Sequence, residues 1–201
     1  MSKMQRFKGY MLFIVFILFL TGCTGVQSSS STKITIEPYV LSDQESLLVG
    51  KTGVDTIDYF NVTGTLEEGS DLQFLVEEYE NGEFKQELFK TFAEVEDTFK
   101  KELISFGINT IQEEDSHFLN VVASTPSSIL STNYTDHMAM STTGVLIDGK
   151  VTLENNKPIY LAAWIGTNKD SLHSIGSEHG EFPEGIEEAE KALVFKVLLT
   201  K

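Results

Sequence analysis

The chain has 201 residues, with 15 Lys and Arg against 30 Asp and Glu, and its net charge at pH 7 is −15. This length suits one compact domain. A strongly acidic chain is repelled by phosphate backbones and anionic headgroups, and its single arginine, Arg6, lies close to the N-terminus. We therefore expect no binding to nucleic acid.

The first 22 residues have the pattern of a secretory signal peptide. Lys3, Arg6 and Lys8 precede an uninterrupted apolar run over residues 11–20, which is about half the length of a membrane-spanning helix. The run ends at Leu20-Thr21-Gly22-Cys23. These four residues resemble the lipobox of bacterial lipoproteins. The loss of all arginine with the signal favours an AT-rich genome, as in many Gram-positive bacteria.

The lipobox resemblance implies cleavage between Gly22 and Cys23, diacylation of Cys23 and a lipid anchor on the extracytoplasmic face of the cell membrane. Cys23 is the only cysteine, so an intramolecular disulfide does not account for it. Two or three acyl chains, at about 0.8 kcal/mol for each buried CH₂, anchor a protein stably. The alternative is a chance cysteine near an ordinary signal cleavage site.

The chain that follows the signal divides into a tether and a domain. Residues 23–33 are polar and rich in serine, which is typical of a flexible tether because so few apolar groups bury little surface. Residues 34–201 form the predicted domain. Without residues 1–22 the chain has 12 basic and 30 acidic residues, a net charge of −18.

From Val54 onward the alternation of apolar and polar residues predicts β-strands, for example over residues 72–76. Asn81-Gly82 lies between two β-type runs, a strong hairpin signal that predicts a return strand from Phe84 to Phe89. Asp148-Gly149 predicts a second hairpin. We expect glycine at positive φ in both turns, where a side chain is costly.

Two further strands are predicted towards the C-terminus. Ile159 to Ile165 contains the single tryptophan, Trp164. Leu193 to Leu199 is apolar on both faces, which is typical of a strand in the centre of a sheet.

The segment from Thr91 to Phe106 allows two interpretations. Its apolar residues recur at spacings of 3, 4, 4 and 3, as in a helix: Phe92, Val95, Phe99, Leu103 and Phe106. Thr91 and Glu94 would form a capping box. However, Gly107 is poor inside a helix, and apolar residues alternate after Leu103. We predict a strand over Leu103 to Ile111 and a loop or short helix over Thr91 to Glu102.

About eight strands with closely spaced turns predict an all-β fold, an antiparallel β-sandwich. The domain loosely resembles the small lipoproteins of Gram-positive bacteria that have immunoglobulin-like domains. This resemblance implies an immunoglobulin-like sandwich behind the signal helix and tether, and it assigns no functional residues.

One motif matches an enzyme family by spacing alone. Lys51-Thr52-Gly53 resembles the third motif of penicillin-binding proteins and β-lactamases, and Ser30 with Lys33 has the S-x-x-K spacing. Ser30, however, falls in the predicted tether, and the sequence has no S-x-N element. We interpret residues 51–53 as a loop.

Histidines and carboxylates occur together in one polar stretch. His173 and His179, with Glu178 and Glu181, include ligand types that zinc accepts, but the spacing is unusual and a tetrahedral site needs further ligands. We expect solvent-exposed histidines and no tight metal site. His137 follows an aspartate, but nothing in the sequence supplies an activated serine. We therefore expect no catalytic residues, no cofactor and no enzymatic activity.

The acidic residues gather in four clusters that lack the pattern of a calcium-binding loop. We interpret them mainly as a solvated surface, and the aromatic residues as core. The clusters are Glu67-Glu68, Glu77-Glu78-Tyr79-Glu80, Glu113-Glu114-Asp115 and Glu187-Glu188-Ala189-Glu190.

These features predict a membrane-anchored extracytoplasmic lipoprotein that acts as a binding or interaction module. Its expected partners are the membrane, through the lipid on Cys23, and a protein or envelope component of unknown identity. The alternatives are a structural envelope accessory with no specific ligand and a hydrolase with an unrecognised site. The long polar segment from Gly166 to Glu190 is either part of a binding site, together with the neighbouring end of the Trp164 strand, or a mobile decorative loop. If it is part of a site, shortening it should abolish capture of a partner and leave the melting temperature nearly unchanged.

Overall fold

A computed structural model of the chain describes residues 33–92, 97–113, 116–135 and 138–201. The predicted signal peptide, Gly22, Cys23 and His137 lie outside these ranges. The described residues belong to one compact unit, Ser31–Lys201. In these residues no helix is long and apolar enough to cross a membrane.

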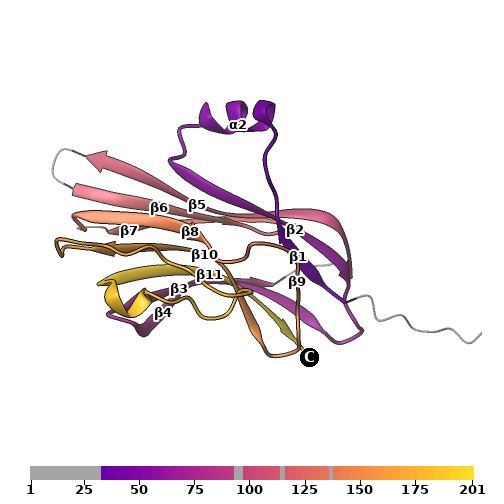
Figure 1. The fold of residues 1–201 in the computed structure, drawn as a ribbon. Helices are drawn as coiled ribbons and strands as arrows, with labels where there is room; N and C mark the ends of the chain where they lie inside the picture. The colour runs from indigo at the N-terminus through magenta and orange to yellow at the C-terminus, as the bar shows by residue number, and fades with distance from the viewer. Residues whose placement is uncertain (1–32, 93–96, 114–115, 136–137) are drawn as a thin grey trace, which may run out of the picture. The chain divides into compact units, whose positions relative to one another are not determined.

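The domain is an antiparallel β-sandwich of two sheets, stacked face to face (Figure 1). The first sheet has six strands in the order β7-β6-β5-β2-β1-β9, and the second has five in the order β4-β3-β11-β10-β8. The first comprises β1 (Thr35–Pro38), β2 (Thr56–Thr65), β5 (Thr98–Glu113), β6 (Ser116–Ser124), β7 (Ile129–Thr135) and β9 (Val151–Thr152). The second comprises β3 (Asp71–Glu80), β4 (Glu83–Phe92), β8 (Met140–Val145), β10 (Pro158–Thr167) and β11 (Lys191–Thr200). The predicted all-β sandwich is confirmed.

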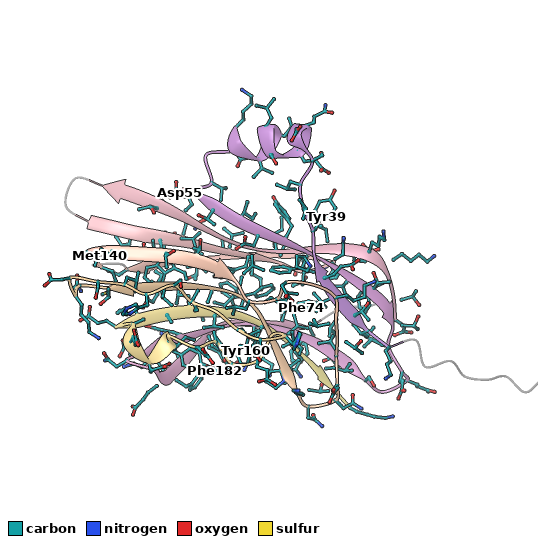
Figure 2. All side chains as sticks on the ribbon, in the orientation of Figure 1. Tyr39, Asp55, Phe74, Met140, Tyr160 and Phe182 are labelled. Atoms are coloured by element: carbon teal, nitrogen blue, oxygen red, sulfur yellow. The ribbon has the colours of Figure 1, made fainter. Side chains whose placement is uncertain are left out.

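The main hydrophobic core lies between the two sheets. The rings of Phe106 on β5 and Phe195 on β11 stack across it, with centroids 5.8 Å apart and planes 8° apart. Phe74 also lies between the sheets (Figure 2), and Trp164 is buried in the same cluster. The predicted strand from Leu193 to Leu199 lies within β11, which pairs with both β3 and β10, so its central position is confirmed.

The two predicted hairpins have opposite outcomes. Asn81 and Gly82 have φ values of +52° and +82° and join β3 to β4, as predicted. The prediction of a hairpin at Asp148-Gly149 is wrong. β8 before it belongs to the second sheet and β9 after it to the first, so the chain crosses between the sheets there. Gly149 is not among the residues with positive φ.

A β-bulge in β5 explains the helical spacing of its apolar residues. Val62 pairs with Glu102 and Thr63 pairs with Lys100, so Lys101 is the extra residue. Phe99 and Ile104 are both buried although they are five residues apart, which strict alternation does not allow. The predicted strand over 103–111 is confirmed. The prediction of a loop or short helix over residues 91–102 is wrong for the strand residues that the structure describes there. β4 continues to residue 92, and β5 begins at residue 98.

The segment between β10 and β11 covers the outer face of the second sheet. It contains the 3-10 helix η2 (Ile186–Glu188) and buries Ile186 and Ala189 against Val194 and other residues in a second hydrophobic cluster. Backbone bonds fasten it in its middle and at its C-terminal end: Tyr160 N donates to Gly180 O at 2.9 Å, and Glu190 N donates to Gly166 O at 3.1 Å. The interpretation as a decorative loop is therefore wrong, because this segment completes a core.

Candidate functional site: a groove beneath helix α2

A groove of about 490 Å³ lies between the outer face of the first sheet and helix α2 (Asp43–Gly50), which stands above that face in Figure 1. Helix α2 was not predicted. The groove is formed by side chains from α2, from the segment leading into it (where Figure 2 labels Tyr39), and from β2 and β5. They are Tyr39, Leu41, Glu45, Leu48, Val49, Tyr59, Asn61, Lys101 and Leu103.

Helix α2 begins with a capping box. The Ser42 hydroxyl accepts a hydrogen bond from Glu45 N at 3.4 Å, while the Glu45 carboxylate accepts from Ser42 N at 2.8 Å. Tyr39 Oη donates to the same carboxylate at 2.8 Å. The Ser42 side chain and backbone hold the pKa of Glu45 below its usual range, and the bond to Glu45 raises the pKa of Tyr39. The carboxylate in the groove wall is thus already satisfied by the protein.

The floor of the groove includes the bulged residue of β5. Lys101 adopts φ +63°, a left-handed conformation that is uncommon for residues other than glycine. The bulge leaves Lys100 and Lys101 both exposed, although they are consecutive in a strand. Lys101 lies on the same face of β5 as Leu103, two residues further on, and both line the groove, whereas the bulge breaks the alternation between Lys100 and Lys101. Bulges and strained residues of this kind are common at functional sites.

Three polar side chains in the groove have no partner in the described part of the chain. Tyr59 and Asn61 point outwards from β2 and make no side-chain hydrogen bond there, and Lys101 makes no ion pair. Burial raises the pKa of Tyr59, so its hydroxyl stays protonated at neutral pH. The floor thus presents a phenol, an amide and an ammonium that can all donate hydrogen bonds.

The apolar side chains around the groove are unusually exposed. No residue of α2 is buried, and Leu47 and Leu48 are 62% and 61% exposed. Val40, just before the helix, is 86% exposed, and Leu103 in the groove is 42% exposed. Apolar walls with a few unpaired donors are the usual composition of a binding site. This arrangement suits an apolar segment that carries an anionic group.

A sequence signal for α2 is present but short. Ser42-Asp43-Gln44-Glu45 has the S-x-x-E pattern of a capping box, followed by Leu47-Leu48-Val49. Lys51-Thr52-Gly53 follows the helix as a turn, which confirms its interpretation as a loop. The groove itself joins residues that are distant in sequence, and only the fold brings them together.

The polar stretch with His173 and His179 lies in the cover of the second sheet. His173 Nδ1 is 2.5 Å from Glu188 Oε2, and Glu181 N donates to Glu178 O at 3.0 Å. Within the described residues, no three His, Cys, Asp or Glu side chains gather in a way that could hold a metal ion.

The acidic cluster on β3 is only partly a solvated surface, which corrects one prediction. Glu77 and Glu78 are 5% and 3% exposed. They point to opposite faces of the second sheet. Glu78 accepts hydrogen bonds from Tyr134 Oη at 2.7 Å and from Gln86 Nε2 at 2.6 Å in the space between the sheets. Both carboxylates are satisfied by fixed partners and are structural in this fold.

Comparison with known proteins places the whole domain in one family. Residues 35–199 match the family described as YgaN domain. Neither the curated proteins nor the solved structures give a match. Because the match extends from β1 almost to the end of β11, the chain belongs to the YgaN domain family.

Proposed function

We propose that this protein is a lipid-anchored extracytoplasmic binding module that holds an apolar peptide segment of another envelope protein in the groove beneath α2. The observation that carries the binding role is the exposed apolar rim of α2 beside a floor of unpaired donors. The anchoring role is supported by Leu20-Thr21-Gly22-Cys23 after an apolar run.

The chemistry of the partner follows from the groove. Leu48, Val49 and Leu103 offer apolar contacts, while the ammonium of Lys101 lacks a counter-ion in the described part of the chain. A partner segment with apolar side chains and one carboxylate would match both features, and a carboxylate on lysine gives a charge-assisted hydrogen bond. The surface spread over Val40 and Leu47 extends beyond the groove, which favours a peptide segment over a small molecule.

The anchor is tested by mass spectrometry of the mature protein isolated from membranes. The expected N-terminal residue is Cys23 with its acyl chains. Cys23→Ala should leave the protein unprocessed by the lipoprotein pathway and move it out of the membrane-anchored fraction. An unmodified N-terminus, or one at another residue, contradicts the anchoring role. It has no bearing on the proposed binding role of the groove.

The groove is tested by selecting a random peptide library on residues 24–201 and measuring the selected peptides by fluorescence anisotropy. We expect peptides with apolar residues and an Asp or Glu, whose affinity falls at least about tenfold in Leu48→Glu and in Lys101→Glu. Lys157→Glu, an exposed lysine outside the groove, is the matched control and should bind normally.

Two results contradict the binding role. One is a library that yields no peptide dependent on Leu48, and the other is equal binding by wild-type protein and Lys101→Glu. Either result favours a structural accessory of the envelope without a specific ligand.

A further inference from the structure

One side of the sandwich is almost free of charge. From Ser116 to Ile147 the sequence has a single charged residue, Asp136, although 22% of the whole chain is charged. This stretch provides β6, β7 and β8. In the first sheet β7 is the edge strand, with β6 as its only strand partner in the described part of the chain.

An edge strand has a row of backbone N–H and C=O groups that can pair with another strand, and proteins usually protect such edges. Edge strand β4 contains Glu83, Lys85, Glu87 and Lys90, and its pairing with β3 is broken by two register shifts. Both charges and bulges oppose pairing with another chain.

The other two edges are also protected. β9 has only two residues. At β8, the chain after β10 lies close by: Asn168 Oδ1 accepts from Ala139 N at 3.0 Å, and a Cβ at Gly144 would come within 2.7 Å of Ile175 Cγ2. Of the four edges in the described part of the chain, β7 alone is neither very short, covered by another segment, charged nor interrupted by a bulge.

We infer that β7 is a self-association edge, which pairs antiparallel with β7 of a second copy of this chain to join two first sheets into one. The occupant follows from charge. Each copy without residues 1–22 has a net charge of −18, so two copies repel each other. The repulsion is weakest in an orientation that keeps the charged residues of both copies far from the contact. Contact through the side formed by β6, β7 and β8 therefore causes the least repulsion, and the unprotected edge strand β7 lies on this side.

The strand sequence allows symmetric pairing. With Thr132 on the two-fold axis, all seven residues of β7 find a partner: Ile129 faces Thr135, Leu130 faces Tyr134 and Ser131 faces Asn133. Each pair joins positions of equal parity, so the half-buried side chains of both copies stay on the side of the second sheet. Only uncharged side chains then meet across the axis, so no like charges are opposed.

The test uses residues 24–201, which contain the compact unit Ser31–Lys201 and lack Cys23. Sedimentation at concentrations up to about 1 mM, the weak end of measurable affinities, should show a dimer fraction that rises with concentration. Thr132→Glu places like charges opposite each other on the axis and should weaken the dimer at least about tenfold. Thr91→Glu, at a half-buried threonine on edge strand β4, adds the same charge and should leave the dimer unchanged.

Oxidative cross-linking provides a second measurement that does not depend on a charge at the edge. Thr132→Cys should form a disulfide-linked dimer much faster than Asn133→Cys, because only residue 132 faces its own copy in this register. A monomer at every concentration, equal weakening by Thr91→Glu, or equal cross-linking rates at 132 and 133 would overturn the inference. Peptide binding in the groove beneath α2 is a separate property and does not depend on this edge.

Discussion

The ammonium of Lys196 on β11 lies 2.6 Å from the Glu77 carboxylate on β3, within the apolar outer layer of the second sheet. Their side chains are only 14% and 7% exposed. Tyr79 Oη donates to the same carboxylate at 2.9 Å, and burial together with this carboxylate raises the pKa of Tyr79. Phe182 packs on Tyr79 with ring centroids 5.3 Å apart, so the segment between β10 and β11 covers the tyrosine that donates to this carboxylate.

Breaking this ion pair on one side should be costly. In Lys196→Met the Glu77 carboxylate stays buried without its counter-ion, so the free energy of unfolding should fall by about 3 kcal/mol or more. The combined variant Glu77→Leu, Lys196→Met should regain most of that loss, because no buried charge remains. Urea unfolding monitored by tryptophan fluorescence gives both values.

The same sheet supplies the matched control. Lys85 and Glu80 form an ion pair of 3.0 Å at the surface, with side chains 55% and 36% exposed. Lys85→Met should change stability far less than Lys196→Met, because solvent screens an exposed pair. Equal losses for Lys85→Met and Lys196→Met would mean that burial of the second pair has no energetic consequence.

The two glycines of the predicted hairpins should differ in their tolerance of a side chain. Gly82 has φ +82°, and a Cβ there would lie 2.9 Å from Glu187 Cα. Gly82→Val should therefore cost about 1 kcal/mol or more. Gly149 is not at positive φ and has no heavy atom within 4 Å of the position of an added Cβ, so Gly149→Val should leave stability nearly unchanged. Thermal unfolding of the two variants compares them directly, and an equal loss would contradict the turn assignments.

These glycines also show what the sequence predicts well and what it does not. Asn81-Gly82 is a local signal, because a two-residue turn is determined by the backbone freedom of its own residues. Asp148-Gly149 has the same local pattern, but the apolar residues beside it pack in different layers: Leu146 N bonds to Leu161 in the second sheet and Leu153 N to Ile34 in the first. Tertiary contacts decide that outcome.

The candidate site was missed for a related reason. The strands with regular alternation were predictable, but the bulge at Lys101 shifts the phase of β5 and gives Phe99 and Phe106 a helix-like spacing. Glu77 and Glu78 looked like surface residues because their partners, Lys196 and Tyr134, are far away in the sequence. The groove beneath α2 likewise joins residues that are distant in the sequence, such as Leu48, Tyr59 and Lys101.

The cover of the second sheet should be essential for stability. Ile186 in η2 is 1% exposed and belongs to the second hydrophobic cluster. Ile186→Ala should reduce the free energy of unfolding by about 2 to 4 kcal/mol, because the deletion leaves a cavity in a packed layer. Glu187→Ala changes the exposed neighbour in the same 3-10 helix and should have little effect. A loss below about 0.5 kcal/mol in Ile186→Ala would instead support the interpretation of this segment as a decorative loop.

Asp58 on β2 should make the domain less stable as the pH rises. It lies on the same face of β2 as the buried Phe60, makes no ion pair with the described residues, and burial raises its pKa. The folded state therefore holds the Asp58 proton more tightly than the unfolded state. The contribution of Asp58 to stability is greatest below the unfolded value of about 3.9 and is lost as the pH rises through the folded value.

Asp58→Asn removes this dependence and should raise the melting temperature at pH 7 relative to the wild type. The advantage should disappear at a pH below both values, where the wild-type carboxyl is neutral as well. Asp55→Asn is the contrasting variant, because the Asp55 carboxylate accepts a hydrogen bond from Thr110 N at 2.6 Å and its loss should not stabilise the domain. Scanning calorimetry at pH 7 and in acid measures all three proteins. A lower melting temperature for Asp58→Asn at pH 7 would show that the buried carboxylate has a stabilising partner after all.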